Sequence, residues 1–217
     1  MEEHIKIEKI VPGGSMYYLT VSGQETPLAV SEELVYKFRL KEGIVITLPQ
    51  FEKLKAESDR LACDSLVRHF LAGREYSSGE LKAKLARRQF PPALIDLTVK
   101  KYVAMGLVDD ARYALKAAEK TLEKNPAGRA YLIAFLQRKK IDRELAEKIA
   151  ETVLAGQDET MLALNSLKKR WRLIGHFELE RARRKAYNYL SRRGIGYEAA
   201  KTAFERLYKL QNKVDDD

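Results

Sequence analysis

The sequence predicts a mainly α fold, in which three tandem three-helix repeats form an elongated curved array behind a small β-rich N-terminal module. The main observation is a phrase that recurs three times: leucine, a spacer, two cations, one further residue and a large apolar residue. Its leucines are Leu85, Leu136 and Leu190, which lie 51 and 54 residues apart. Apolar positions downstream keep these offsets, whereas the first 57 residues contain the period-two alternation typical of strands.

The N-terminal module is expected to contain a hairpin, further short strands and one helix. Residues 5–10 alternate apolar and polar side chains, and residues 16–21 are rich in β-forming residues. Residues 12–14 supply the turn between them. A helix capped by Ser31 should run to about Arg39. The other expectations are a strand at residues 28–30 and, at residues 44–47, either a last strand or an apolar lead into the next helix.

From about Ser58 the hydrophobic period becomes helical. The first repeat should contain a helix over residues 58–71 that stops at Gly73. Ser77-Ser78-Gly79-Glu80 has the spacing of a capping box and predicts a second helix through Gln89. Pro91-Pro92 interrupts that helix, and a third is expected over residues 93–105, ending at Gly106.

The second and third repeats follow the same plan. In the second, the helix starts are expected at Asp109, at Asn125-Pro126 and at Asp142. In the third, helices are expected over residues 157–173, 178–193 and 197–210. The predicted domains are therefore an N-terminal module at 1–57, repeats at 58–107 and 108–156, and a third repeat with an acidic tail at 157–217.

Composition excludes several classes of protein. No apolar run approaches the roughly 20 residues needed to span a bilayer, and the first four residues lack the features of a signal peptide. We therefore expect a cytoplasmic protein with no membrane contact. The single cysteine, Cys63, lies in register with Val67 and Phe70 and is expected to be buried. The three histidines are scattered, and nucleophile, phosphate-loop and metal motifs are missing, so we predict no catalytic residue, no metal site and no cofactor.

Positive charge belongs to the repeats. The formal net charge is +9, with 7 Lys/Arg against 9 Asp/Glu in residues 1–57 and 33 against 22 in residues 58–217. Residues 165–194 hold 10 Lys/Arg but only Glu178 and Glu180 as acids, a net of +8. Such density repels itself unless a polyanion neutralises it.

Two sets of cations are candidates for polyanion contact. The stronger candidates share the dense region of the third repeat: Lys168, Lys169, Arg170, Arg172, Arg183, Arg184, Arg192 and Arg193. The weaker candidates end the middle helices of the first two repeats: Arg87, Arg88, Arg138 and Lys139. A structural explanation stays open for both sets, because cations stabilise helix C-termini and also cover solvated helix faces. Trp171 and Tyr187 lie among these cations, and we favour packing over base stacking for Trp171.

Two stretches of the sequence resemble the RecX family of recombinase regulators. One follows a Ser-x-x-Glu-Leu-x-x-Lys-Leu pattern and runs from Ser77 to Leu85, and the other is Gly106-Leu107-Val108-Asp109-Asp110-Ala111-Arg112-Tyr113-Ala114. Gln89 and Lys140 depart from the family, in which glycine is usual at the end of the middle helix; Gly194 keeps it. Such a residue must adopt a left-handed conformation at some cost or end the helix in another way.

The resemblance implies a regulator, most simply an inhibitor, that binds the groove of the RecA recombinase filament on DNA. It would limit filament extension, ATP hydrolysis and strand exchange, and would bind single- and double-stranded DNA without sequence specificity as a monomer. Two alternatives stay open. A stand-alone, sequence-nonspecific nucleic-acid-binding protein would use the same cations without a recombinase, and a helical adaptor would contact protein through apolar or acidic faces.

Overall fold

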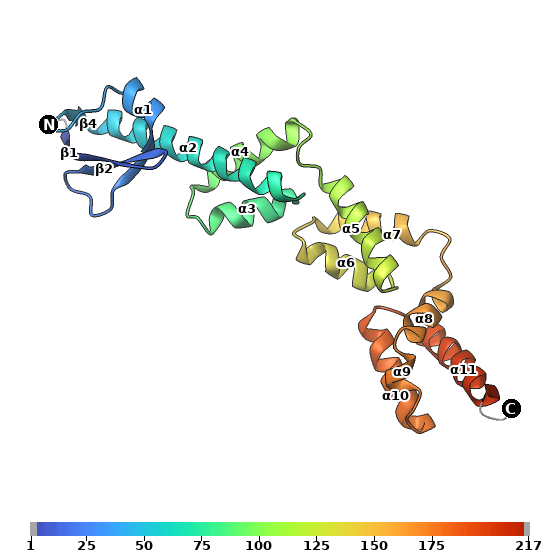
Figure 1. The fold of residues 1–217 in the computed structure, drawn as a ribbon. Helices are drawn as coiled ribbons and strands as arrows, with labels where there is room; N and C mark the ends of the chain where they lie inside the picture. The colour runs from blue at the N-terminus through green and yellow to red at the C-terminus, as the bar shows by residue number, and fades with distance from the viewer. Residues whose placement is uncertain (1–3, 215–217) are drawn as a thin grey trace. The chain divides into compact units, whose positions relative to one another are not determined.

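The computed structural model describes residues 4–214, so the predicted acidic tail at 215–217 lies outside the described residues. Four strands and eleven helices form in this part of the chain, which confirms the mainly α fold with an N-terminal β-rich module (Figure 1). Two compact units can be distinguished. One comprises Met1–Arg74 with Lys82–Tyr102, and the other comprises Glu75–Leu81 with Val103–Asp217.

The N-terminal module is a four-stranded antiparallel sheet in the order β3-β2-β1-β4. Its central hairpin pairs Gly13 with Met16 around Gly14, whose φ of 70° is readily adopted only without a side chain. Buried Ile7, Leu19 and Val30 face the helices that follow. The elements are β1 (His4–Gly13), β2 (Met16–Val21), β3 (Leu28–Ser31), α1 (Glu32–Lys37) and β4 (Val45–Thr47).

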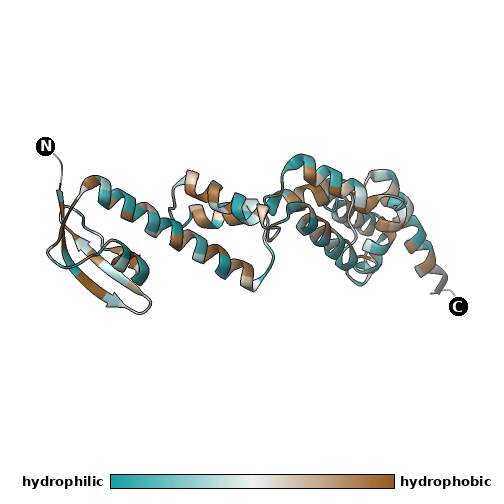
Figure 2. Ribbon diagram, turned by 90° about the horizontal axis from the view of Figure 1, so that it is seen from above, coloured by the Kyte–Doolittle hydropathy of each residue, from teal (hydrophilic) through white to brown (hydrophobic). Residues whose placement is uncertain are grey.

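The helix that follows β4 begins ten residues earlier than predicted. α2 spans Leu48–Gly73, so the expected start near Ser58 was wrong. Thr47 and Gln50 form a capping box, which fixes the start immediately after the strand. Ser58 instead lies buried in mid-helix, where its hydroxyl donates to the backbone oxygen of Ala29. In Figure 2, hydrophilic and hydrophobic residues alternate along this helix, as expected for one that covers a sheet and then continues into a repeat.

The first unit also contains most of α3 (Ser78–Ala86) and α4 (Pro92–Ala104). α2 and α4 are tied by Asp64, whose carboxylate lies 2.6 Å from the Lys101 ammonium and 3.1 Å from the Tyr102 hydroxyl. Burial opposes ionisation of Asp64, but the hydrogen bonds from Lys101 and Tyr102 and the nearby charge of Arg68 hold its pKa below the usual range. Cys63 is fully buried beside Asp64, as predicted.

The second unit holds two helical cores. One forms between α5 (Asp110–Lys124), α6 (Arg129–Arg138) and α7 (Arg143–Leu154), and is lined by small and aliphatic residues such as Ala114 and Leu136. The other forms between α8 (Glu159–Lys168), α9 (Trp171–Ile174), α10 (Leu179–Arg192) and α11 (Tyr197–Val214). The predicted helix at 157–173 was therefore wrong in its second half. The backbone switches to a tighter turn at Arg170, which brings Trp171 and Ile174 onto the third core.

The three middle helices all end in a left-handed residue, which is one of the two alternatives that the sequence left open for Gln89 and Lys140. Gln89 and Lys140 have φ values of 62° and 59°, and Gly194 at the equivalent position has 68°. The two non-glycine residues therefore adopt the strained conformation that glycine adopts freely in the third repeat. The amide of Ile141 closes its turn on the carbonyl of Leu136, as Ile195 does on Leu190.

Candidate polyanion-binding site

In two places the cationic turn that ends one middle helix contacts the start of the preceding middle helix. We call the contact between α6 and α3 the first joint and the contact between α10 and α6 the second joint. The Ser77 hydroxyl, at the start of α3, donates to the backbone oxygen of Lys139 at 2.6 Å. At the equivalent place the Gly128 amide, at the start of α6, donates to the backbone oxygen of Arg193 at 2.8 Å. Ser77 and Gly128 are 51 residues apart, and Lys139 and Arg193 are 54 apart, which are the offsets of the sequence repeat. Each joint is therefore a repeated feature.

Both joints require a glycine near the helix start. A Cβ on Gly79 would collide with the backbone oxygen and Cβ of Lys140, and one on Gly128 would collide with the carbonyl of Gly194. The third repeat has no equivalent opening, because α10 has 14 residues against 9 and 10 in α3 and α6. Its Ala182, which aligns with Ser77 and Gly128, is buried inside the helix.

At the first joint a carboxylate lies near the cation of the turn. The Tyr113 hydroxyl donates to the Glu80 carboxylate at 2.9 Å, and the Lys139 ammonium lies 3.9 Å from the same carboxylate. Ser78 bonds to Asp110 through both its amide and its hydroxyl. The positive charge of Lys139, one of the weaker candidates, is thus partly offset by a carboxylate of the protein itself.

The other turn cations are more open. Arg87 and Arg88 are exposed at the end of α3. The Arg138 guanidinium lies 5.9 Å from the ring centre of Tyr131, and that of Arg193 lies 5.0 Å from the same centre. Arg192 donates from Nε to the Asn188 backbone oxygen, one turn back in α10. Such contacts fit stabilisation of helix C-termini and also leave the charges available to an anion.

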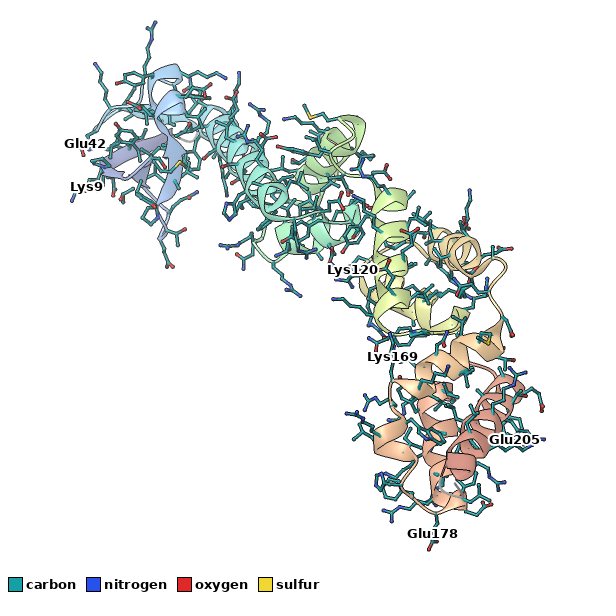
Figure 3. The ribbon with its side chains drawn as sticks, turned by 45° about the vertical axis from the view of Figure 1, so that its right-hand side comes forward. Lys9, Glu42, Lys120, Lys169, Glu178 and Glu205 are labelled. Atoms are coloured by element: carbon teal, nitrogen blue, oxygen red, sulfur yellow. The ribbon has the colours of Figure 1, made fainter. Side chains whose placement is uncertain are left out.

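The candidates around α9 include exposed side chains and one side chain that bonds to another helix. Lys168 and Arg172 are exposed. The Lys169 ammonium donates to the backbone oxygens of Glu123 and Lys124 at 3.1 and 2.7 Å, and so satisfies the open C-terminus of α5 (Figure 3). The sequence did not indicate this contact, because it joins residues 45 positions apart.

Along α10 the candidates differ in the same way. Arg183 forms a 2.7 Å ion pair with Glu180, one turn away, whereas Arg184 is exposed. Trp171 packs against Phe204 with ring centres 5.9 Å apart, which confirms packing for this residue. Tyr187 likewise meets Phe204 edge to face.

Sequence reasoning missed the aromatic members of this surface. Tyr131 and Tyr189 line a hollow beside Arg170, Arg192 and Arg193. The sequence could have indicated Tyr131, because the 51-residue offset aligns it with Glu80 of the predicted capping box. Tyr189 gave no such signal, because an aromatic residue at helical spacing is more often part of a core.

The described residues hold no cluster of three or more His, Cys, Asp or Glu that could bind a metal ion. Burial raises the pKa of the Cys63 thiol, against the opposing hydrogen bond with Thr98, and this disfavours the reactive thiolate. No helix within residues 4–214 has the length and apolar character needed to cross a bilayer.

The fold and this surface define a helical-repeat protein with cationic turns at its joints. No family model matches the chain. It is 28% identical over 154 residues to the regulatory protein RecX of Chlorobium phaeobacteroides (strain BS1), covering 70% of this chain and 96% of the relative. It is 24% identical over 181 residues to RecX of Clostridioides difficile (strain 630), covering 83% and 84%.

Two solved structures share the fold. A crystal structure of regulatory protein RecX matches with a TM-score of 0.64 and 20% identity, over 92% of this chain and 99% of that one. RecX from Lactobacillus salivarius matches with a TM-score of 0.58 and 17% identity, over 70% and 97%. The chain is therefore similar in sequence to curated RecX regulatory proteins and shares the fold of two solved RecX structures.

Proposed function

We propose that this protein regulates the RecA recombinase by binding the groove of the RecA–DNA filament as a cytoplasmic monomer. Binding there limits filament extension, and with it ATP hydrolysis and strand exchange in DNA repair and the SOS response. The observation that carries the proposal is similarity to RecX regulatory proteins combined with cationic turns repeated at both joints. Tandem units with a repeated contact can engage successive units of a helical filament.

The proposed contacts with phosphate and with acidic RecA surface are the cations of the two candidate sets. Lys168, Arg172 and Arg184 of the third repeat are exposed to solvent. Arg87, Arg88, Arg138, Arg170, Arg192 and Arg193 complete the set, while Lys139, Lys169 and Arg183 share their charge with groups of the protein. Phosphate contacts of this kind position a protein on DNA without reading sequence.

A stand-alone, sequence-nonspecific nucleic-acid-binding protein is the second candidate. The observation that favours it is the density of cations in the third repeat, since cations that neutralise phosphates supply nonspecific binding without a second protein. The two functions differ in stoichiometry: a filament regulator acts at few molecules per filament, whereas a DNA binder acts only when it covers the DNA.

The test is ATP hydrolysis by the cognate RecA on single-stranded DNA, titrated with this protein at two salt concentrations. Inhibition well below one molecule per RecA supports filament regulation. Inhibition only at DNA-saturating amounts favours the stand-alone binder. No effect at any ratio contradicts regulation of RecA.

A further inference from the structure

A hollow of about 460 Å³ lies at the second joint, where the first turn of α6 meets the end of α10. Four cations line it, and two tyrosine rings complete its polar wall. The other two lining residues are aliphatic, and none of the eight is acidic. The six polar lining residues are Tyr131, Arg170, Lys185, Tyr189, Arg192 and Arg193.

Three of the four cations lie against aromatic rings, and Arg192 donates to the backbone oxygen of Asn188. The Arg193 guanidinium lies 5.0 Å from the ring centre of Tyr131 and 5.7 Å from that of Tyr189. The Arg170 guanidinium lies 5.3 Å from the ring centre of Tyr189, and the Lys185 ammonium lies 4.3 Å from that of Phe177. A ring attracts a cation at such distances without cancelling its charge. The hollow is therefore strongly positive, and its cations lie beside aromatic rings.

At the first joint the cation equivalent to Arg193 is partly neutralised by an acidic side chain. The repeat offsets align Glu80 with Tyr131 and Lys139 with Arg193. At the first joint the Glu80 carboxylate faces the Lys139 ammonium at 3.9 Å. At the second joint the acid is replaced by an aromatic ring and the cation is kept. The difference removes a negative charge and adds a stacking surface.

We propose that this hollow binds one nucleotide of a single-stranded polynucleotide, with its phosphate against the four cations and its unpaired base against the tyrosine and guanidinium planes. The volume falls within the usual range of about 300–1,000 Å³ for small-ligand pockets. Aromatic rings and guanidinium planes stack unpaired bases, whereas the bases of a duplex are already stacked on one another. The inference rests on the nucleic-acid contact of the proposed function and adds the strand class and the position of the site.

The test measures binding of a fluorescein-labelled oligothymidylate by anisotropy, without RecA. Tyr131→Glu installs the acid of the first joint and should weaken binding about fivefold or more, while Tyr131→Phe should bind like the unmodified protein. The double variant Arg170→Gln/Lys185→Gln alters exposed side chains and should also reduce the salt slope by about 0.7 for each phosphate that the protein no longer neutralises. The matched control, Lys148→Gln/Lys201→Gln, removes the same charge from positions outside the hollow.

Equal single-strand affinity of the double variant and its control would overturn the proposal. So would an equal reduction of affinity for a duplex of the same length, which would indicate a general backbone contact. A third contradictory result is unchanged oligothymidylate binding together with abolished inhibition of RecA, which would assign the hollow to an acidic protein segment. If the unmodified protein leaves RecA unaffected but the double variant no longer binds single strands, the proposed function fails and the nucleotide site stands.

Discussion

Gly128→Ala is expected to weaken the second joint. Gly128 has φ −84° and ψ 178°, which alanine also adopts, so the backbone conformation itself does not resist the change. The added Cβ would lie 2.7 Å from the carbonyl carbon of Gly194 and closer still to its oxygen. Ordinary van der Waals contact begins at 3.4 Å, so relief of the carbon contact alone requires a separation of 0.7 Å, and the closer oxygen requires more. If the 2.8 Å bond from the Gly128 amide to the Arg193 carbonyl lengthens equally, it exceeds 3.5 Å, beyond the limit of a hydrogen bond.

The expected decrease in stability is about 0.5–4 kcal/mol. Overpacking costs about 1–3 kcal/mol, and a weakened hydrogen bond adds about 0.5–1.5 kcal/mol. The smaller entropy of the unfolded alanine chain offsets about 0.4–1 kcal/mol of this. Gly73→Ala is the matched control, because its Cβ would meet nothing within 4 Å at the end of α2.

Urea unfolding measures the effect with two probes. Circular dichroism follows all helices, while fluorescence of the only tryptophan, Trp171, follows the third core. Gly128→Ala should lower the midpoint and separate the two transitions, since its joint connects the second and third repeats. An unfolding midpoint equal to that of Gly73→Ala, with coincident probes, would refute the steric reasoning.

Three further changes test other features. Gln89→Gly relieves a left-handed residue and should stabilise the protein by up to about 1 kcal/mol in urea unfolding; a decrease would show that its side chain outweighs the strain. Asp64→Asn should destabilise at pH 7. Because the folded pKa of Asp64 is lowered, its contribution is present above the unfolded value of about 3.9 and disappears as pH falls through the folded value. The gap between the two proteins in acid titrations of stability should therefore close below about pH 4, and a constant gap would contradict the ionic role. Replacing Lys168, Lys169 and Arg170 together by Ala should weaken duplex binding and flatten its salt slope by about 0.9 for each phosphate no longer neutralised. An unchanged slope would show that these three residues do not contact the DNA. Of the single variants, Lys169→Ala should lower stability, by about 0.5–1.5 kcal/mol, and Lys168→Ala should not.

Local signals predicted several of the helix starts that have side-chain caps. The Ser77 hydroxyl and the Glu80 carboxylate form the expected capping box, and Asp109 and Asp142 cap α5 and α7. These bonds join residues two or three apart, so spacing alone identifies them. The early start of α2 was missed because Thr47 serves both as the last strand residue and as the cap.

The joints and the hollow could not be predicted in the same way. Ser77 and Lys139 are 62 residues apart, and neither residue type indicates the other. Charge density identified Arg170 and Arg193, but their distances to Tyr131 and Tyr189 depend on how the repeats pack. The break at Arg170 likewise arises from packing of Trp171 and Ile174 on the third core, which outweighs a helical pattern in the sequence.

The direction of the joints bears on how the chain folds during its synthesis. The middle helices α3 and α6 each obtain the partner for their first turn from the repeat that is made after them. At about 5–20 residues per second, the 62 residues between Ser77 and Lys139 take about 3–12 s to synthesise. During that interval the Ser77 hydroxyl at the start of α3 cannot yet bond to Lys139 on the nascent chain. The Gly128 amide at the start of α6 likewise obtains its partner only when Arg193 has been made. In the third repeat the aligned residue, Ala182, is buried inside the longer α10, so the start of that helix forms without a partner from a later repeat.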